Sequence, residues 1–259
     1  TNHVYLKKTK EALVNLVEVL KILKYDKEFI KQIPLLKTYF SLKKNGFFWW
    51  NGLHPEVQYF MHDLVLEVVK NYKVDGIQGD DRLPAMPSEG GYDSFTTKEY
   101  AKEHNGLSPT LDTKNPAWVQ WRANKLSAFA KDLFKNIKST NKNCIVSWAP
   151  SIYPWSLEQY LQDWPTWLTQ NYADIVIPQV YRYKFESYST TLKAIAGHVP
   201  LEFKNKLYPG ILTSLGDGYR VDSVFFDKMI SLNRAEGYNG EVLFYYETIK
   251  DAKIPIYKY

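Results

Sequence analysis

VDGIQGDD, residues 74–81, is the stretch of sequence that decides the fold class. It follows residues 54–72, an amphipathic segment whose apolar side chains recur with the period of a helix. A short apolar alternation then predicts a strand over residues 74–80. The strand ends on two adjacent carboxylates, Asp80 and Asp81. Because α/β enzymes place their active sites at the carboxyl ends of parallel strands, both aspartates are candidate catalytic residues.

Side-chain alternation along this strand separates the two carboxylates. Successive residues of a strand point to opposite faces, so Gln78 and Asp80 share one face and Asp81 points elsewhere. An aspartate pair at a strand end is also a common turn cap, and that structural alternative stays open.

Four further strands follow, each preceded by a predicted helix, at residues 144–148, 173–181, 207–215 and 240–247. This alternation predicts parallel strands with right-handed crossovers. Several strands end on polar or aromatic side chains, namely Asp80, Trp148, Gln179, Tyr181, Ser214 and Glu247. Such strand ends are typical of a (β/α)₈ TIM-barrel-like fold with its site at that end. A doubly wound sheet, the alternative, would need a glycine-rich phosphate turn, and none follows an early strand.

Two segments beside the first aspartates contribute further candidates. Residues 47–50 predict a short aromatic strand, which Asn51 and His54 follow before a helix that has Pro in its first turn. The expected buried stripe of that helix is Val57, Phe60, Leu64, Val65 and Val68. Residues 83–115 are too long for an ordinary connection, so we expect an extended loop over the site.

Composition narrows the class of protein. The chain has 259 residues, and we treat 1–259 as a single domain. Aromatic residues make up 16%, with 8 Trp and 20 Tyr, which is more than a core needs and suits a cleft that stacks sugar rings. The net charge of +5 is spread along helix faces, so nucleic-acid binding is not expected.

Metal and nucleophile chemistries are not indicated. The five histidines are scattered, the chain has one cysteine, and Ser147 and Ser151 lack the glycine pattern of a nucleophile elbow. We therefore predict no catalytic metal and no cofactor. No run of residues is long and apolar enough for a transmembrane segment. We expect a monomer that is exported, periplasmic or on the cell surface. No signal peptide is recognised in the chain, and a processed export signal is one explanation.

Six stretches together carry a family resemblance. They are WNGLHPEV (50–57), NYKVDGIQGDD (71–81), WVQWRANKLSAFAKDLFKNIK (118–138), NCIVSWAPS (143–151), DIVIPQVYR (174–182) and VLFYYE (242–247). Over residues 45–250 the chain resembles the glycoside-hydrolase-like family 10 proteins of bacteria. The resemblance implies a TIM-barrel glycosidase fold. It also implies cleavage of a bacterial cell-wall or related amino-sugar glycan, such as peptide-free peptidoglycan strands.

Two features depart from the family pattern. Gly79 stands where the family usually has an aromatic residue between the Gln and the Asp pair. The family also has several βα units before the HPEV helix, whereas here only some fifty residues precede it. Either the barrel has a shortened, incomplete N-terminal part, or the numbered chain omits residues of the molecule.

The chemistry of glycoside cleavage requires two carboxyl groups with different roles. One protonates the leaving oxygen, and the other acts as nucleophile or base. Asp80 is the first choice, because DGIQGD is similar to the DGxRxD motif of the α-amylase superfamily, in which the last Asp is the nucleophile. The chitinase motif DGxDxDxE would place its acid on Arg82, so that mechanism does not transfer intact. Glu247 is the predicted partner across the cleft, with Asp81, Glu89 and Asp93 as alternatives.

The remaining candidates are substrate-binding groups: Gln78, Arg82, Tyr92, Trp148, Tyr153, Trp155, Gln179, Tyr181, Asn51 and His54. The aromatic members could stack on sugar rings, with core packing as the alternative for each, and His54 could simply cap its helix. The sequence therefore predicts a glycoside hydrolase acting on an uncharged or weakly charged glycan. The alternative is a non-catalytic carbohydrate-binding barrel.

Overall fold

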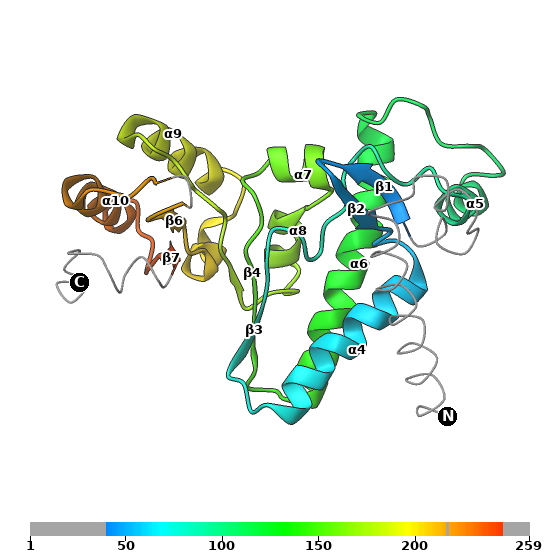
Figure 1. Ribbon diagram of the computed structural model, residues 1–259, viewed down its shortest axis with the longest axis horizontal. Helices are drawn as coiled ribbons and strands as arrows, with labels where there is room; N and C mark the ends of the chain where they lie inside the picture. Colours follow the sequence, from blue (N-terminus) through cyan, green and yellow to red (C-terminus); the bar gives the residue numbers. More distant parts are fainter. Residues whose placement is uncertain (1–39, 216–217, 246–259) are drawn as a thin grey trace.

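The computed structural model of the chain describes residues 40–215 and 218–245. Within these ranges helices and parallel strands alternate along the chain (Figure 1). The helices are α4 Pro55–Asn71, α5 Ser94–Glu103, α6 Pro116–Thr140, α7 Trp155–Tyr160, α8 Trp164–Thr169, α9 Phe185–Ala196 and α10 Ser223–Ala235, with one 3₁₀ helix at Leu201–Lys206.

Five parallel strands are arranged in chain order. β3 Gly76–Gly79, β4 Ile145–Trp148 and β5 Ile175–Val176 form one parallel sheet, and β6 Gly210–Leu212 pairs in parallel with β7 Val242–Phe244. Single parallel bridges, Val176 with Leu207 and Gln179 with Gly210, connect β5 to the β6 region. The five predicted parallel strands are confirmed. A closed eight-stranded barrel is not seen in the described part of the chain.

Each of these strands is shorter than its predicted bounds. Proline explains two cases, because it has no backbone N–H to give to a ladder. Pro178 interrupts the extended segment after β5, and Pro209 directly precedes β6. Gln179 beyond Pro178 keeps only a bridge to Gly210. The chain therefore leaves the sheet early, and the residues after β5 turn toward the carboxyl ends of the neighbouring strands.

A β-hairpin precedes α4. β1 Phe40–Lys44 and β2 Phe47–Trp50 pair antiparallel around Asn45-Gly46, whose φ angles of 53° and 81° lie in the left-handed region. Asn-Gly is the favoured pair for such a two-residue turn. The aromatic strand predicted at 47–50 is confirmed, but its partner is β1 rather than a strand of the parallel sheet.

The core lies between the parallel sheet and helices α6 and α8. Val146, Trp148 and Val176 are fully or almost fully buried, in one cluster with Leu133 of α6 and Trp167 of α8. Parallel strands are normally covered by helices in this way, which explains the apolar character of this sheet face. We call it the outer face of the β3–β4–β5 sheet.

The predicted buried stripe of α4 is wrong in part. Leu64 and Val68 are 41% and 36% exposed, whereas Val57 and Val69 are buried. The helix packs along α6 (Figure 1), and its inward residues recur every fourth position, through Val57 and Val69. The apolar positions on the adjoining side of α4 therefore face outward. No described helix is long and apolar enough to cross a membrane.

Candidate functional site

Polar side chains gather on the other face of the same sheet, which we call the inner face. Gln78 of β3 pairs in register with Ser147 of β4, whose Oγ lies 3.4 Å from Gln78 Oε1. Gly79 between Gln78 and Asp80 is buried, while both neighbours are exposed. This pattern agrees with the predicted alternation, so Gln78 and Asp80 share the inner face.

Asp80 meets a side chain from another strand. Gln179, which follows β5, donates its Nε2–H to Asp80 Oδ1 at 3.3 Å and to the Ala149 carbonyl at 2.9 Å. The backbone contact fixes the orientation of the amide, since Gln179 Oε1 cannot then take the place of Nε2. Residues 99 positions apart in the chain thus meet at the carboxyl ends of β3 and β5.

Asp81 has different surroundings. Its side chain is only 26% exposed and forms an ion pair with Arg82. Burial raises the pKa of the Asp81 carboxyl above its usual range; Arg82 opposes this rise and the charge of Asp80 adds to it. The two adjacent carboxyl groups therefore differ in environment, which is the condition for giving them different protonation states.

Tyr181 lies beside both aspartates. Burial raises the pKa of its phenol well above the usual range, and the negative charges of Asp80 and Asp81 raise it further. The ring packs against Phe244 at the end of β7, with the ring centroids 5.2 Å apart. Tyr181 therefore keeps its proton at neutral pH and can donate a hydrogen bond at the strand ends.

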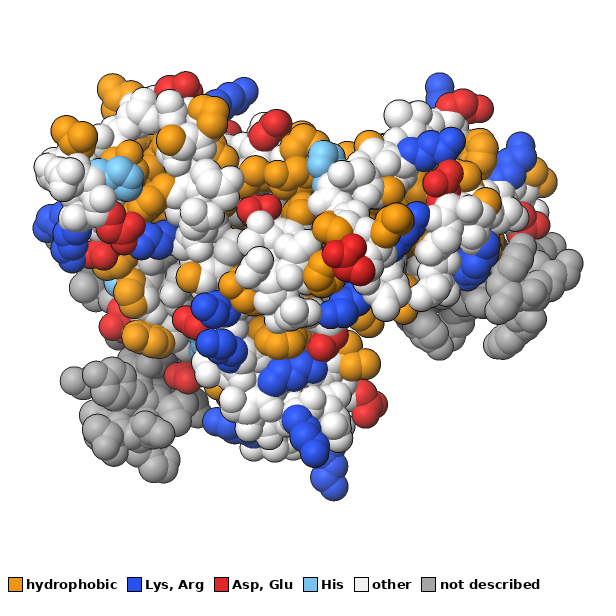
Figure 2. All heavy atoms as spheres, turned by 180° about the vertical axis from the view of Figure 1, so that it is seen from behind, with side chains coloured by type: hydrophobic (Ala, Val, Ile, Leu, Met, Phe, Trp, Pro, Cys, Tyr) orange, Lys and Arg blue, Asp and Glu red, His pale blue; other side chains and the backbone are white. Residues whose placement is uncertain are grey.

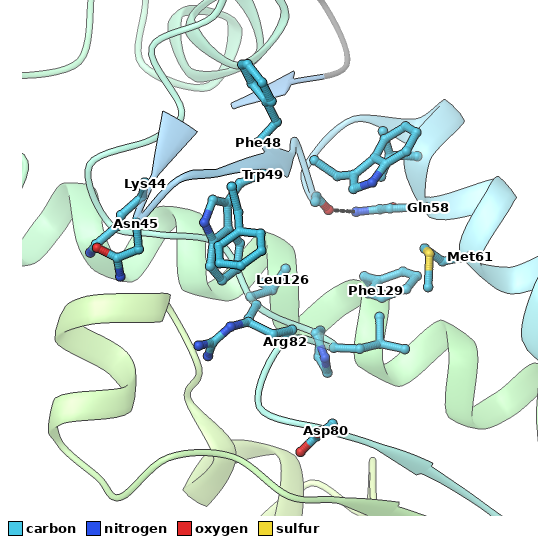
Figure 3. Close-up of a pocket in the computed structure, with 17 residues that line it drawn as sticks. Lys44, Asn45, Phe48, Trp49, Gln58, Met61, Asp80, Arg82, Leu126 and Phe129 are labelled. Atoms are coloured by element: carbon cyan, nitrogen blue, oxygen red, sulfur yellow. Dashed lines mark hydrogen bonds between the residues drawn. The ribbon is translucent and has the colours of Figure 1, made fainter. Parts of the chain in front are cut away.

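An apolar hollow of about 790 Å³ adjoins Asp80 (Figure 3). Asp80 and Arg82 line it together with apolar side chains from β2, α4 and α6, among them Trp49, Met61 and Phe129. Its volume lies in the range of ligand-binding cavities. The sequence predicted an aromatic strand here but not the hollow, because the hollow depends on how the hairpin sits over α4 and α6.

Comparison with known proteins now decides the family. Residues 29–215, well over half of the chain, match the family described as Glycosyl hydrolase-like 10. The chain belongs to the glycosyl hydrolase-like 10 family. No curated protein sequence gives a significant match.

Solved structures similar to this glycosyl hydrolase-like 10 protein include the PgaB (BpsB) glycoside hydrolase domain from Bordetella bronchiseptica. The two share 15% sequence identity at a TM-score of 0.66, over 83% of this chain and 65% of that domain. At this identity the likeness shows the fold, which is that of a TIM-barrel-like glycoside hydrolase domain.

Two weaker likenesses are a bee venom hyaluronidase in complex with a hyaluronic acid tetramer and a chitinase from Chromobacterium violaceum. The hyaluronidase is 15% identical over 80% of this chain and 75% of that one, with a TM-score of 0.47. The chitinase is 12% identical over 78% and 72%, with a TM-score of 0.48. At these scores they add nothing to the fold assignment.

The glycine between Gln78 and Asp80 has a packing explanation. Gly79 pairs in register with Trp148, and a Cβ at position 79 would lie 2.3 Å from Trp148 Cε3 and 2.4 Å from the Leu83 carbonyl oxygen. Both distances are too short for any side chain. The aromatic ring of Trp148 thus occupies the space over Gly79 on the outer face.

The prediction that Trp148 stacks on a sugar is wrong. Its side chain is 1% exposed, its Nε1–H donates to the Tyr172 carbonyl at 2.9 Å, and its ring packs edge-on against Trp167. The register places Trp148 opposite Gly79 on the outer face, so the ring belongs to the core. Its place in the chain, at the end of an apolar strand, could not distinguish the two faces.

Three further predicted binding residues have structural roles. Asn51 is fully buried and donates to Asp93 Oδ2 at 2.9 Å, and the Tyr92 hydroxyl donates to the Thr110 carbonyl at 2.9 Å. His54 caps α4 by accepting the Glu56 N–H, as the structural alternative predicted, and burial lowers the pKa of its imidazole. These contacts anchor the long loop and the helix rather than present groups to a ligand.

Tyr153 and Trp155 lie before and at the start of α7. Tyr153 packs against Trp164 and His198, and burial raises the pKa of its phenol. Trp155 is 45% exposed and contacts Tyr160, so one part of its ring remains available for stacking.

Of the other candidate acids, Glu89 pairs with Lys44 and Asp93 caps α5. Glu247 lies outside the described residues, and its role stays a prediction. Among residues 40–215 and 218–245, no group of three or more His, Cys, Asp or Glu side chains is placed to hold a metal ion.

Proposed function

We propose that this protein hydrolyses glycosidic bonds of a bacterial cell-wall glycan, with Asp80 as the essential carboxylate. The observation that carries the proposal is the meeting of Asp80 and Gln179 at the ends of β3 and β5, beside a second carboxyl group of different environment. The family and the fold support a glycan hydrolase in general. An exported location is proposed together with the cell-wall substrate.

The roles of the carboxyl groups follow from their surroundings. Asp80 is exposed and accepts a hydrogen bond from Gln179, so it is suited to stabilise or attack the positively charged sugar carbon. The second group must hold a proton for the leaving oxygen. In the described part of the chain Asp81 fits best, because burial raises the pKa of its carboxyl. Glu247, predicted to face Asp80 from the last strand, is the other candidate.

The proposed substrate is a peptide-free peptidoglycan strand or a similar amino-sugar polymer. Its sugar rings would stack on aromatic side chains near the strand ends. The half-exposed ring of Trp155 and the ring of Tyr181 beside Phe244 are the proposed stacking groups. The hydroxyl groups would bond to the inner-face amides of Gln78 and Gln179. The resemblance to bacterial cell-wall glycosidases supports this substrate class.

The test is incubation of the full chain with a panel of bacterial glycans, including intact and peptide-free peptidoglycan, followed by product analysis. Asp80→Asn, Asp81→Asn and Glu247→Gln are compared with Asp132→Asn, an exposed carboxylate on α6 that serves as the matched control. Loss of cleavage in Asp80→Asn and in one of the other two supports the proposal and identifies the acid. Binding without cleavage by the unaltered chain would favour a carbohydrate-binding barrel instead.

A further inference from the structure

Arg82 is held from several sides at once. Its Nη1 forms an ion pair with the Asp81 carboxylate and also lies 3.4 Å from the Asp81 carbonyl oxygen. The centre of its guanidinium group is 5.2 Å from the ring centroid of Trp49 and 5.0 Å from that of Tyr160. A planar guanidinium stacks well on aromatic rings, so the two rings restrict its orientation. Figure 3 shows Arg82 and Trp49.

The two rings come from separate parts of the fold. Trp49 belongs to β2 and Tyr160 to α7, and their ring centroids lie 5.6 Å apart. Lys44 also lies over Tyr160 at 5.1 Å while it pairs with Glu89 at 2.8 Å. The hairpin and α7 thus meet around the arginine, although its side chain remains 52% exposed.

The backbone beside Arg82 is fixed as well. The amide of Gln162, a fully buried side chain, donates to the Asp81 carbonyl at 3.3 Å and to the Pro84 carbonyl at 3.1 Å. An exposed ion pair usually contributes little, because two mobile side chains must be ordered to form it. Here the rings order the guanidinium and Gln162 orders the main chain, so the pair with Asp81 forms at a smaller entropic cost.

We propose that Arg82 is a positioning residue that fixes the orientation of the Asp81 carboxyl group beside Asp80, and not a group that binds substrate. Its effect on catalysis rests on the proposed glycosidase function, whereas its effect on Asp81 does not. The guanidinium is already engaged by a carboxylate and two rings, which leaves it poorly placed to follow a moving ligand.

The charged and titratable groups around Asp81 define what removal of Arg82 does. They are Arg82 and Asp80 on the same segment and Tyr181 after β5, with the Lys44–Glu89 pair also beside Tyr160. Arg82 lowers the pKa of Asp81, while burial and Asp80 raise it. A backbone hydrogen bond at Asp81 also lowers the pKa and remains when Arg82 is removed. Loss of Arg82 takes away the larger of the two lowering influences, so Asp81 should titrate at higher pH.

The experiment follows the Asp81 carboxyl carbon by NMR during a pH titration of the full chain. Arg82→Met should move the Asp81 titration to higher pH. Arg82→Lys, which keeps the charge but loses the planar fork, should give a smaller move in the same direction. Tyr160→Leu should act like Arg82→Lys, and Tyr160→Phe, which keeps the ring, should have no effect.

Arg234→Met is the matched control, because it removes an arginine from a different ion pair, with Glu241. An Asp81 titration in Arg82→Met that does not differ from that of the unaltered chain overturns the inference. Should Arg82→Met fail to fold, Arg82→Lys and Tyr160→Leu decide the question by the same readout.

Enzyme kinetics provide a second test, beside the NMR titration. On a glycan that the unaltered chain cleaves, Arg82→Met should lower kcat by about ten- to a hundredfold with little change in KM, as expected when a catalytic group is displaced by roughly 1 Å. A raised KM with kcat retained would assign Arg82 to substrate binding and refute the inference. If no glycan is cleaved, the proposed function fails while the NMR arm still decides the role of Arg82.

Discussion

The two faces of the β3–β4–β5 sheet are built from the same short strands, but the inner face is polar and the outer face is apolar and buried. The inner face presents Gln78, Ser147 and Asp80, and Gln179 reaches it from the end of β5. The outer face places Trp148 against Gly79 and packs it onto α8. A shift of one residue along a strand separates a side chain that meets solvent from one that the helices enclose.

This contrast shows that residue type alone does not identify a site. Trp148 and Trp155 are both tryptophans near the end of β4, yet one is 1% and the other 45% exposed. The difference lies in strand register and in whether the residue stands within the strand or beyond it. The two faces should therefore respond differently to mutation: the inner face through activity and the outer face through stability.

The largest effect is expected for Asp80→Asn on the inner face. The substitution keeps the shape and removes the charge, so activity on a confirmed glycan should fall by about 10²–10⁴-fold. Because Asp80 is exposed, the free energy of unfolding should change by no more than about 0.5 kcal/mol. Steady-state kinetics and thermal melts measure the two quantities. Near-normal activity of Asp80→Asn would show that Asp80 is not the essential carboxylate.

Trp148→Ala tests the outer face. Truncation of a fully buried tryptophan should cost about 3–5 kcal/mol of unfolding free energy, since it leaves a cavity under the strands and an unpaired carbonyl at Tyr172. Chemical denaturation measures this loss. If the variant is as stable as the parent chain but binds oligosaccharide weakly, Trp148 contacts the sugar and is not a core residue.

Gly79→Ala should destabilise the same face by about 1–3 kcal/mol through overpacking. The added methyl would collide with the indole of Trp148 and with the Leu83 carbonyl. Combination with Trp148→Ala should relieve only the first collision, so the two losses should not add. A double-mutant cycle measures this coupling, and strict additivity would contradict the packing account.

Trp155→Ala should affect binding rather than folding. Loss of an exposed stacking ring is expected to weaken oligosaccharide binding by about 0.5–1.5 kcal/mol, which is roughly 2- to 13-fold in Kd. Its half-exposed position predicts a small change in melting temperature. Calorimetric titration with a peptide-free glycan gives the affinity. A stability loss as large as that of Trp148→Ala would instead assign Trp155 to the core.

The smallest effect concerns pH. Because burial raises the pKa of Asp81 in the folded chain, the folded state holds this proton to higher pH than the unfolded state does. Its contribution to stability is complete below the unfolded pKa of about 3.9 and is lost as the pH rises through the folded value. Asp81→Asn cannot lose a proton. The variant should therefore gain stability relative to the parent chain as the pH rises from about 4 toward neutrality.

Denaturant melts of both proteins across this range measure the difference. If Asp81→Asn instead loses stability relative to the parent chain as the pH rises, the ion pair with Arg82 outweighs burial. The pKa of Asp81 would then be lowered in the folded chain and not raised.

The parallel strands could be predicted because each follows a helix and carries a recognisable apolar run. Their number in the described part, their order and the polar strand ends were all visible in the sequence. Their lengths were not, since Pro178 and Pro209 end the ladders earlier than the apolar runs suggest. The inner-face position of Asp80 followed from side-chain alternation alone.

The remaining features depend on contacts between distant segments. The pairing of Gly79 with Trp148 requires the register of β3 and β4, which the sequence does not specify. Arg82 lies between rings from β2 and α7, and no local pattern joins residues 49, 82 and 160. Acidic residues on the long loop were reasonable candidate acids until Glu89 was found paired with Lys44 and Asp93 at the cap of α5.

The contact between Gly79 and Trp148 also constrains how this chain can change over generations. A larger side chain at position 79 cannot be introduced while position 148 holds tryptophan, since the space is already filled. A larger residue at position 79 would first require a smaller residue at position 148. The variant with only that smaller residue would be less stable than the present chain. Positions 79 and 148 are therefore sterically coupled, and the effect of a substitution at one depends on the residue at the other.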